Sequence, residues 1–270
     1  MYKNYVFDLY GTLVDIHTDE EKKEVWEKLS LFYGYYGARY TPKELYEAYK
    51  SLVKDAENAG GSHEAYPEIR IETVFAKLFE EKGVQPGDAL ALYAGQFFRA
   101  LTTEYVRLYE GAAGLLEGLR GQGKKVYLLS NAQRIFTEYE LQMLDIARCF
   151  DGILISSDFG VKKPDQKFFE ILLKKYVLNP RECIMIGNDR YSDIAGARGV
   201  GMDTYYIHSN ISPVTDGEIS ATYVQKEMDL KETARRLGIK KTEKGIVFDE
   251  ECKRMEAILY NTGISEGLHV

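Results

Sequence analysis

Short apolar runs alternate with helical patterns along the second half of the chain, and this alternation constrains the fold more than any other feature. Amphipathic helical stretches separate runs of strand length, which lie at residues 125–131, 152–156, 183–187, 204–208 and 221–224. Apolar strands that are joined through helices are typical of a parallel sheet covered by helices on both faces. The pattern therefore predicts the α/β class, with a doubly wound, mostly parallel, Rossmann-like sheet.

One more strand stands apart from this series, at Tyr5–Phe7, and it runs directly into Asp8. Between it and the next strand, residues 16–108 show the apolar spacing of helices and no strand signal. Thr41 and Glu44 have the spacing of a capping box, which predicts a helix start there. An insertion at this place should lie over the carboxyl ends of the strands. We expect a core at 1–15 and 109–238, an all-helical cap domain at 16–108, and a C-terminal extension at 239–270 whose role stays open.

The composition excludes several classes of partner. The chain of 270 residues has a formal net charge of −7, so the clustered basic surface that nucleic acids require is not expected. No apolar run approaches about 18 residues, which argues against a membrane span. The three cysteines lack metal-ligand spacing and no signal segment opens the chain, so we expect reduced thiols and a cytoplasmic location. A small anionic metabolite remains a suitable ligand, because a local basic pocket can oppose the overall charge.

Polar side chains stand at the end of each expected core strand or in the loop that follows it. The carboxyl ends of parallel strands meet at one edge of a sheet, where open α/β folds bind their ligands. We therefore expect these side chains to lie close together: Asp8 and Thr12, Ser130 and Asn131, Lys163, and Asn188, Asp189 and Asp193.

Such a group suits the attack of a carboxylate on an electrophile that carries negative charge. Asp8 would be the nucleophile and form an acyl-type covalent intermediate. A hydroxyl at Ser130 or Thr12 would bind an oxyanion, and Lys163 would keep Asp8 ionised. Asp189 and Asp193 would place Mg²⁺ beside Asp8, because this cation prefers carboxylate and other hard oxygen ligands.

Four segments of the chain together carry a family resemblance. They are Asp8-Leu9-Tyr10-Gly11-Thr12-Leu13, Ser130-Asn131, Lys163-Pro164-Asp165, and Gly187-Asn188-Asp189 followed by Asp193. In this order they resemble the four signature motifs of the haloacid dehalogenase-like hydrolase superfamily, over residues 1 to about 238. The resemblance implies a hydrolase with a helical cap inserted after the first core strand. Most members resemble phosphatases of small metabolites, and a minority are dehalogenases.

Tyr10 departs from the phosphatase pattern, in which this position holds an aspartate that acts as general acid and base. A phenol is a weak base at neutral pH, although the Tyr10 backbone carbonyl remains a suitable Mg²⁺ ligand. The 2-haloacid dehalogenases of the superfamily resemble the chain here, and they use a cap arginine and no metal. Arg39, in the turn after the first cap helix, is a candidate for that arginine. Asn188 stands where many phosphatases have a ligand aspartate.

We expect a Mg²⁺-dependent phosphatase of a small phosphorylated metabolite. A metal-independent 2-haloacid dehalogenase is the first alternative, and a binding or regulatory protein that has lost turnover is the second. A homodimer stays open. The expected catalytic residues are Asp8, Tyr10 and Lys163; the expected substrate-binding residues are Thr12, Ser130, Asn131 and Arg39; the expected metal ligands are Asp8, Tyr10, Asn188, Asp189 and Asp193.

Overall fold

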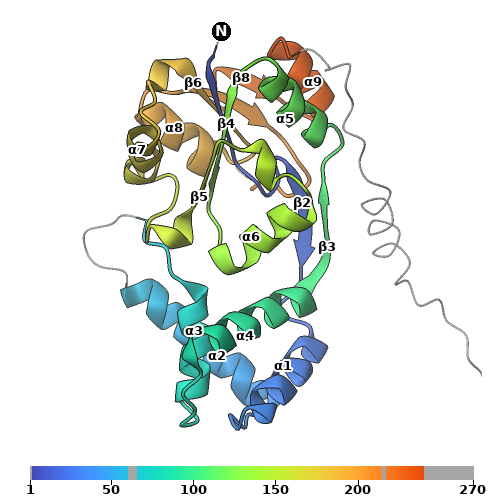
Figure 1. Ribbon diagram of the computed structural model, residues 1–270, viewed down its shortest axis with the longest axis vertical. Coiled ribbons are helices and arrows are strands. Elements are labelled where there is room, and N and C mark those ends of the chain that lie inside the picture. Colours follow the sequence, from blue (N-terminus) through green and yellow to red (C-terminus); the bar gives the residue numbers. More distant parts are fainter. Residues whose placement is uncertain (1, 60–65, 215–216, 240–270) are drawn as a thin grey trace, which may run out of the picture.

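The computed structural model describes residues 2–59, 66–214 and 217–239, and a six-stranded sheet forms its centre (Figure 1). All neighbouring strands are parallel, which confirms the α/β class. In spatial order the strands are β5 (Gly152–Ile155), β4 (Lys125–Ser130), β1 (Asn4–Phe7), β6 (Cys183–Gly187), β7 (Asp203–Ile207) and β8 (Tyr223–Gln225). β1 lies in the middle of the sheet, so Asp8 emerges between the ends of β4 and β6.

Both faces of the sheet are buried, which explains why the strands are apolar without alternation. In β1, Tyr5 and Phe7 pack into one cluster of buried residues, whereas Val6 packs into another on the opposite face. The elements around the sheet are α5 (Ala112–Gly121), α6 (Arg134–Met143), α7 (Gln166–Lys175), α8 (Gly196–Gly199) and α9 (Leu230–Arg236), with short helical turns η1 (Ala147–Cys149), η2 (Ser156–Asp158), η3 (Pro180–Glu182) and η4 (Arg190–Ala195).

Four helices form a body whose buried cluster also includes Ile135 of α6. They are α1 (Lys23–Tyr35), α2 (Pro42–Ala59), α3 (Ile71–Glu80) and α4 (Gly87–Thr102). Aromatic rings fill the centre of this helical body; the ring centroids of Trp26 and Phe98 are 5.6 Å apart, and those of Tyr33 and Phe79 are 4.1 Å apart. The capping box is confirmed, because the Glu44 amide donates to Thr41 Oγ1 at 3.2 Å and the Thr41 amide donates to Glu44 Oε2 at 2.8 Å.

The expectation that residues 16–108 contain only helices is wrong. β2 (Val14–Thr18) and β3 (Thr103–Leu108) pair as an antiparallel ribbon that joins the helical body to the core (Figure 1). Asp15 faces Arg107 across this ribbon, and Arg107 Nη2 donates to Asp15 Oδ2 at 2.7 Å. Two strands of five and six residues are short enough for the flanking helical pattern to hide their alternation.

The helical body also touches the core beyond the ribbon. Ser156 Oγ, after β5, donates to Glu68 Oε2 at 2.7 Å, and the Ile71 amide donates to Gln133 Oε1 at 2.9 Å. Within the ranges that the structure describes, no helix is both long and apolar enough to cross a membrane. Apart from Ile239, the C-terminal extension lies outside the described residues.

Candidate active site

A buried lysine joins two carboxylates at the carboxyl edge of the sheet. Lys163 Nζ lies 2.8 Å from Asp8 Oδ1 and 2.7 Å from Asp193 Oδ1. Asp8 is the residue that follows β1, and Asp193 lies in η4, the turn after β6. The exposed fractions are 8% for Asp8, 2% for Lys163 and 1% for Asp193. The expectation that these strand ends converge is therefore met in the structure.

Burial and charge act against each other at this group. Burial alone would lower the pKa of Lys163, but Asp193 and Asp8 outweigh it and raise this pKa above its usual value. The ammonium therefore stays charged. Burial raises the pKa of Asp193, Lys163 opposes the rise, and the nearby charge of Asp8 adds to it. Two carboxylates and one ammonium leave the group one negative charge in excess when all three are ionised.

Two glycines allow polar side chains to approach the strand ends closely. Gly11 has a φ of +84°, and a Cβ there would lie 2.1 Å from Asn188 Nδ2. A Cβ on Gly187 would lie 2.2 Å from Asp193 Oδ2. Asn188 consequently sits beside the loop after β1, where Thr12 Oγ1 lies 3.2 Å from Asp8 Oδ2 and 3.5 Å from Asn188 Oδ1.

Ser130 and Asn131, at the end of β4, have different surroundings. Ser130 is completely buried, and its Oγ has no hydrogen-bond partner within the described part of the chain. Buried hydroxyls are usually paired, so this atom is a candidate for contact with a ligand. Asn131 instead holds the backbone of Lys163, because its Nδ2 donates to the Lys163 carbonyl at 2.9 Å and its Oδ1 accepts from the Lys163 amide at 2.8 Å. Asn131 thus positions the lysine.

Asp189 is not brought into the group around Lys163. Its Oδ1 caps η4 by accepting from the amides of Tyr191 and Ser192, at 2.7 and 3.2 Å. Its own amide donates to Asp193 Oδ2 at 3.0 Å, which helps to orient that carboxylate. Of the two adjacent candidate ligands, only Asn188 therefore lies with Asp8 and Thr12.

The hydroxyl of Tyr10 points to α6. It lies 3.0 Å from Thr137 Oγ1 and donates to Glu140 Oε2 at 2.5 Å. Burial raises the pKa of Tyr10, and the charge of Glu140 adds to the rise, so the phenol remains protonated. The described residues show no hydrogen bond between this hydroxyl and Asp8, so Tyr10 is held as an anchor for its loop.

The arginine near Tyr10 is Arg99 of α4, which the sequence reasoning missed. Arg99 Nε donates to Glu140 Oε1 at 2.7 Å, and its guanidinium carbon lies 5.8 Å from the centre of the Tyr10 ring. The available signal was a single charged residue among apolar neighbours, in Phe97-Phe98-Arg99-Ala100-Leu101.

The structure does not bring Arg39 to Asp8. Arg39 is exposed in the turn between α1 and α2. The hydroxyl of its neighbour Tyr40 donates to the Leu78 carbonyl at 2.6 Å, near the end of α3. The opposite end of α3 is the one that contacts Gln133 of the core. Arg39 thus lies at the end of the helical body remote from the sheet.

Oxygen ligands for a hard cation lie beside Asp8. Among the described residues, no three His, Cys, Asp or Glu side chains form a metal-binding group. A different donor set is present: the carboxylate of Asp8 and the amide oxygen of Asn188 both face the hydroxyl of Thr12. Carboxylate and amide oxygens are donors that Mg²⁺ accepts, with water completing its shell. The residues therefore fit such an ion.

The arrangement has the features of an enzyme site, and comparison with known proteins identifies the family. Residues 2–201 match the model described as haloacid dehalogenase-like hydrolase. The chain belongs to this family. Its strand-end residues Asp8, Ser130, Lys163 and Asp193 all lie within the matched range.

Two curated relatives of this hydrolase are phosphatases. Ribulose-1,5-bisphosphate 5-phosphatase of Halopiger xanaduensis is 31% identical over 164 residues, which cover 60% of this chain and 65% of the relative. Glyceraldehyde 3-phosphate phosphatase of Pyrococcus furiosus is 35% identical over 102 residues, or 38% of this chain and 42% of the relative. The matches thus span less than two thirds of either relative.

The fold is shared with enzymes of other chemistry. The crystal structure of 2-haloacid dehalogenase from Pseudomonas syringae superposes with a TM-score of 0.58 at 19% identity, covering 88% of this chain and 99% of that one. At this identity the likeness concerns the fold alone, so the choice between reactions depends on the residues of the site.

Proposed function

We propose that this hydrolase is a phosphatase of a small phosphorylated metabolite, with Asp8 as the nucleophile. The observation that carries the proposal is the buried contact of Lys163 Nζ with Asp8 and Asp193 at the carboxyl edge of the sheet. The phosphatase names of the two curated relatives support the same substrate class.

In the proposed reaction, a carboxylate oxygen of Asp8 attacks the phosphorus, and the bond from phosphorus to the leaving oxygen breaks. Water then hydrolyses the aspartyl-phosphate and releases phosphate. The Lys163 ammonium donates to Asp8 Oδ1, and Ser130 Oγ, which has no hydrogen-bond partner among the described residues, donates to a phosphate oxygen. Thr12 Oγ1 donates to the Asp8 oxygen that Lys163 does not contact, so both oxygens of the nucleophile are oriented.

The proposal includes Mg²⁺ held by the Asp8 carboxylate, the Asn188 amide oxygen and the Tyr10 backbone carbonyl. Once bound, the ion would supply positive charge beside a phosphate. The group around Lys163 does not supply a net positive charge, because two carboxylates and one ammonium leave it one negative charge in excess when all three are ionised. We propose Asn188 in preference to Asp189, because Asp189 Oδ1 already accepts two amide hydrogens at the start of η4.

The helical body is proposed to be the cap of this site. Glu68, in the segment between α2 and α3, contacts Ser156 after β5, and Ile71 contacts Gln133 after β4. Both core partners follow carboxyl ends of strands, so the body rests on the edge from which Asp8 emerges. A site covered in this way favours small substrates.

Tyr10 limits the proposed turnover. Its protonated hydroxyl is bound to α6, so the side chain that usually protonates the leaving oxygen has no counterpart at this position. General acid–base catalysis typically contributes about 10²–10⁴-fold. We therefore expect aryl phosphates, whose leaving groups need no proton, to react faster than alkyl phosphates.

A 2-haloacid dehalogenase is the second candidate, and the same residue favours it. Halide leaves as a stable anion and needs no general acid, so the position of Tyr10 would cost such a reaction nothing. In that case Asp8 would displace halide from carbon to form an ester, which water would then hydrolyse. The ammonium of Lys163 would serve as the cation beside Asp8.

The deciding experiment compares the two products with the full chain. Phosphate release from p-nitrophenyl phosphate and glyceraldehyde 3-phosphate is measured with Mg²⁺ and with EDTA, and halide release from 2-chloropropionate is measured in parallel. We expect Mg²⁺-dependent phosphate release that Asp8→Asn abolishes, whereas Asp189→Asn, as the matched change of a neighbouring carboxylate, retains it. Halide release that survives EDTA, without phosphate release, would reverse the assignment. If neither phosphate nor halide is released, a binding or regulatory protein is favoured.

A further inference from the structure

A cavity that is open to solvent lies where the helical body joins the core. Its volume is about 460 Å³, and residues of α4, β3 and α6 line it. The walls are mostly apolar and include Ala100, Val106, Ile135, Phe136, Tyr139 and Met143. This volume lies within the range of about 300–1,000 Å³ that small-molecule pockets occupy. The cavity is therefore large enough for a ligand with an aromatic ring.

Gln96 supplies an unused hydrogen-bond donor in the lining of this cavity. Its Nε2 is buried and has no partner among the described residues. A buried amide nitrogen without an acceptor is unfavourable, and such groups are nearly always paired in native proteins. An acceptor on a bound molecule would provide the missing partner. The unpaired donor of Gln96 distinguishes the cavity from an apolar gap between helices.

The charged groups of the lining are already paired with one another or with neighbours. Arg99 donates to Glu140, and Glu104 is paired with Lys22. Counting these side chains, the cavity offers no excess positive charge to an anion. An uncharged ligand with one carbonyl-type acceptor fits these surroundings better than a phosphate or a carboxylate.

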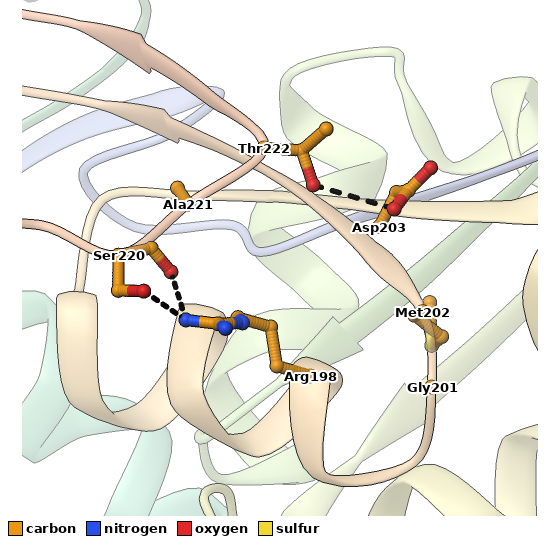
Figure 2. A pocket seen from close by; sticks show the side chains of 7 residues that line it. All are labelled: Arg198, Gly201, Met202, Asp203, Ser220, Ala221 and Thr222. Carbon is orange, nitrogen blue, oxygen red and sulfur yellow. Dashed lines mark hydrogen bonds between the residues drawn. The ribbon is translucent and has the colours of Figure 1, made fainter.

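A polar pocket elsewhere shows the contrast. It lies at the start of β7, the sheet edge opposite to Asp8, and Figure 2 shows its side chains pairing with one another. Arg198 Nη1 donates to the Ser220 carbonyl at 2.7 Å, and Thr222 Oγ1 donates to Asp203 Oδ1 at 3.4 Å. These groups are hydrogen-bonded to one another, so they do not need a ligand to provide a partner.

We propose that the cavity between α4, β3 and α6 binds a small, uncharged, mainly aromatic molecule whose carbonyl oxygen accepts a hydrogen bond from Gln96 Nε2. Its lining includes none of Asp8, Lys163 and Asp193, so it is a site distinct from the one proposed for the phosphorylated substrate. A molecule there would contact α4 of the helical body and α6 of the core together. Binding would therefore hold the two parts in their present arrangement.

The test measures binding directly, so its outcome does not depend on the reaction at Asp8. Acetanilide, an uncharged aromatic amide, and benzoate, an anion of similar size, are titrated into the full chain by calorimetry. We expect acetanilide to bind and to raise the melting temperature, with equal affinity for the Asp8→Asn variant. Benzoate should bind at least several-fold more weakly.

Three variants of α4 locate the bound molecule. Ala100→Trp fills the cavity from an exposed helix position and should abolish acetanilide binding. Gln96→Leu removes the donor and should weaken binding about tenfold, as expected for one lost hydrogen bond. Tyr93→Trp, at an exposed position of the same helix outside the lining, should leave the affinity unchanged. No binding to the natural chain, affinity that Ala100→Trp leaves intact, or equal binding of benzoate would overturn the proposal.

Discussion

Replacing Lys163 with methionine should destabilise the fold strongly, because the change removes one charge from a buried group of three. Methionine keeps most of the side-chain volume, so the effect reports on charge and not on a cavity. Lys163 is 2% exposed and makes contacts of 2.8 and 2.7 Å with two carboxylates. Removing one partner of a buried ion pair typically costs about 3–5 kcal/mol. For a domain of this size we expect the melting temperature to fall by roughly 10 °C.

Acidification should relieve this loss. Burial already raises the pKa of Asp193 in the folded state, and the charge of Lys163 opposes this rise. Without Lys163 the pKa of Asp193 should therefore rise further. A folded-state pKa above the unfolded one means that the folded protein binds more protons, so its stability falls as pH rises through that window. The variant should therefore be closest in stability to the natural protein at the acidic end of the range.

The assay is thermal unfolding in EDTA, followed by circular dichroism at several pH values between the ordinary aspartate pKa and neutrality. Lys174→Met is the matched control, since Lys174 is 78% exposed and, within the described part of the chain, forms its ion pair with Glu170 on its own helix. That control should change stability by about 0.5 kcal/mol or less. A Lys163→Met variant as stable as the control, or one that loses further stability on acidification, would refute the reasoning.

Three further substitutions test other parts of the structure by thermal or urea unfolding. Gly11→Ala should cost about 1–3 kcal/mol because φ is +84° and the new Cβ would meet Asn188; Gly83→Ala, with φ +75° and open space around it, should cost less. Tyr10→Phe leaves Glu140 Oε2 without its donor and should cost about 1–3 kcal/mol, against little change for the exposed Tyr139→Phe. Arg107→Met should destabilise by more than 1 kcal/mol, since Asp15 is buried, and the loss should shrink if Asp15→Asn is added.

The sequence was sufficient to predict the parallel sheet and the residues that gather at its carboxyl edge. Fully buried parallel strands produce unbroken apolar runs, and their shared edge follows from parallel pairing alone, so Asp8, Lys163 and Asp193 could be placed together in advance. The ribbon of β2 and β3 could not, because two short half-buried strands between helices carry too few residues for their alternation to stand out.

The roles of individual side chains were harder to predict than their location. Asn131 stands at the expected strand end, but both ends of its amide bind the Lys163 backbone, which depends on how a distant loop returns. Arg99 approaches Tyr10 only because α4 packs against α6, and helix packing leaves no local signature. Arg39 was chosen from its place in a turn, and the direction of that turn is set by contacts of Tyr40 with α3.

The ribbon has a consequence for how such proteins can diversify. Thr18 and Thr103 are pairing partners, and the Asp19 amide donates to the Thr102 carbonyl at 2.8 Å, so the chain leaves and re-enters the core at neighbouring points. A short turn across these two threonines would close the core without disturbing any strand of the main sheet. On the proposed assignment of the helical body as the cap, an insertion exchanged at this point would change the surface over Asp8 and leave the strands that carry the site residues in place.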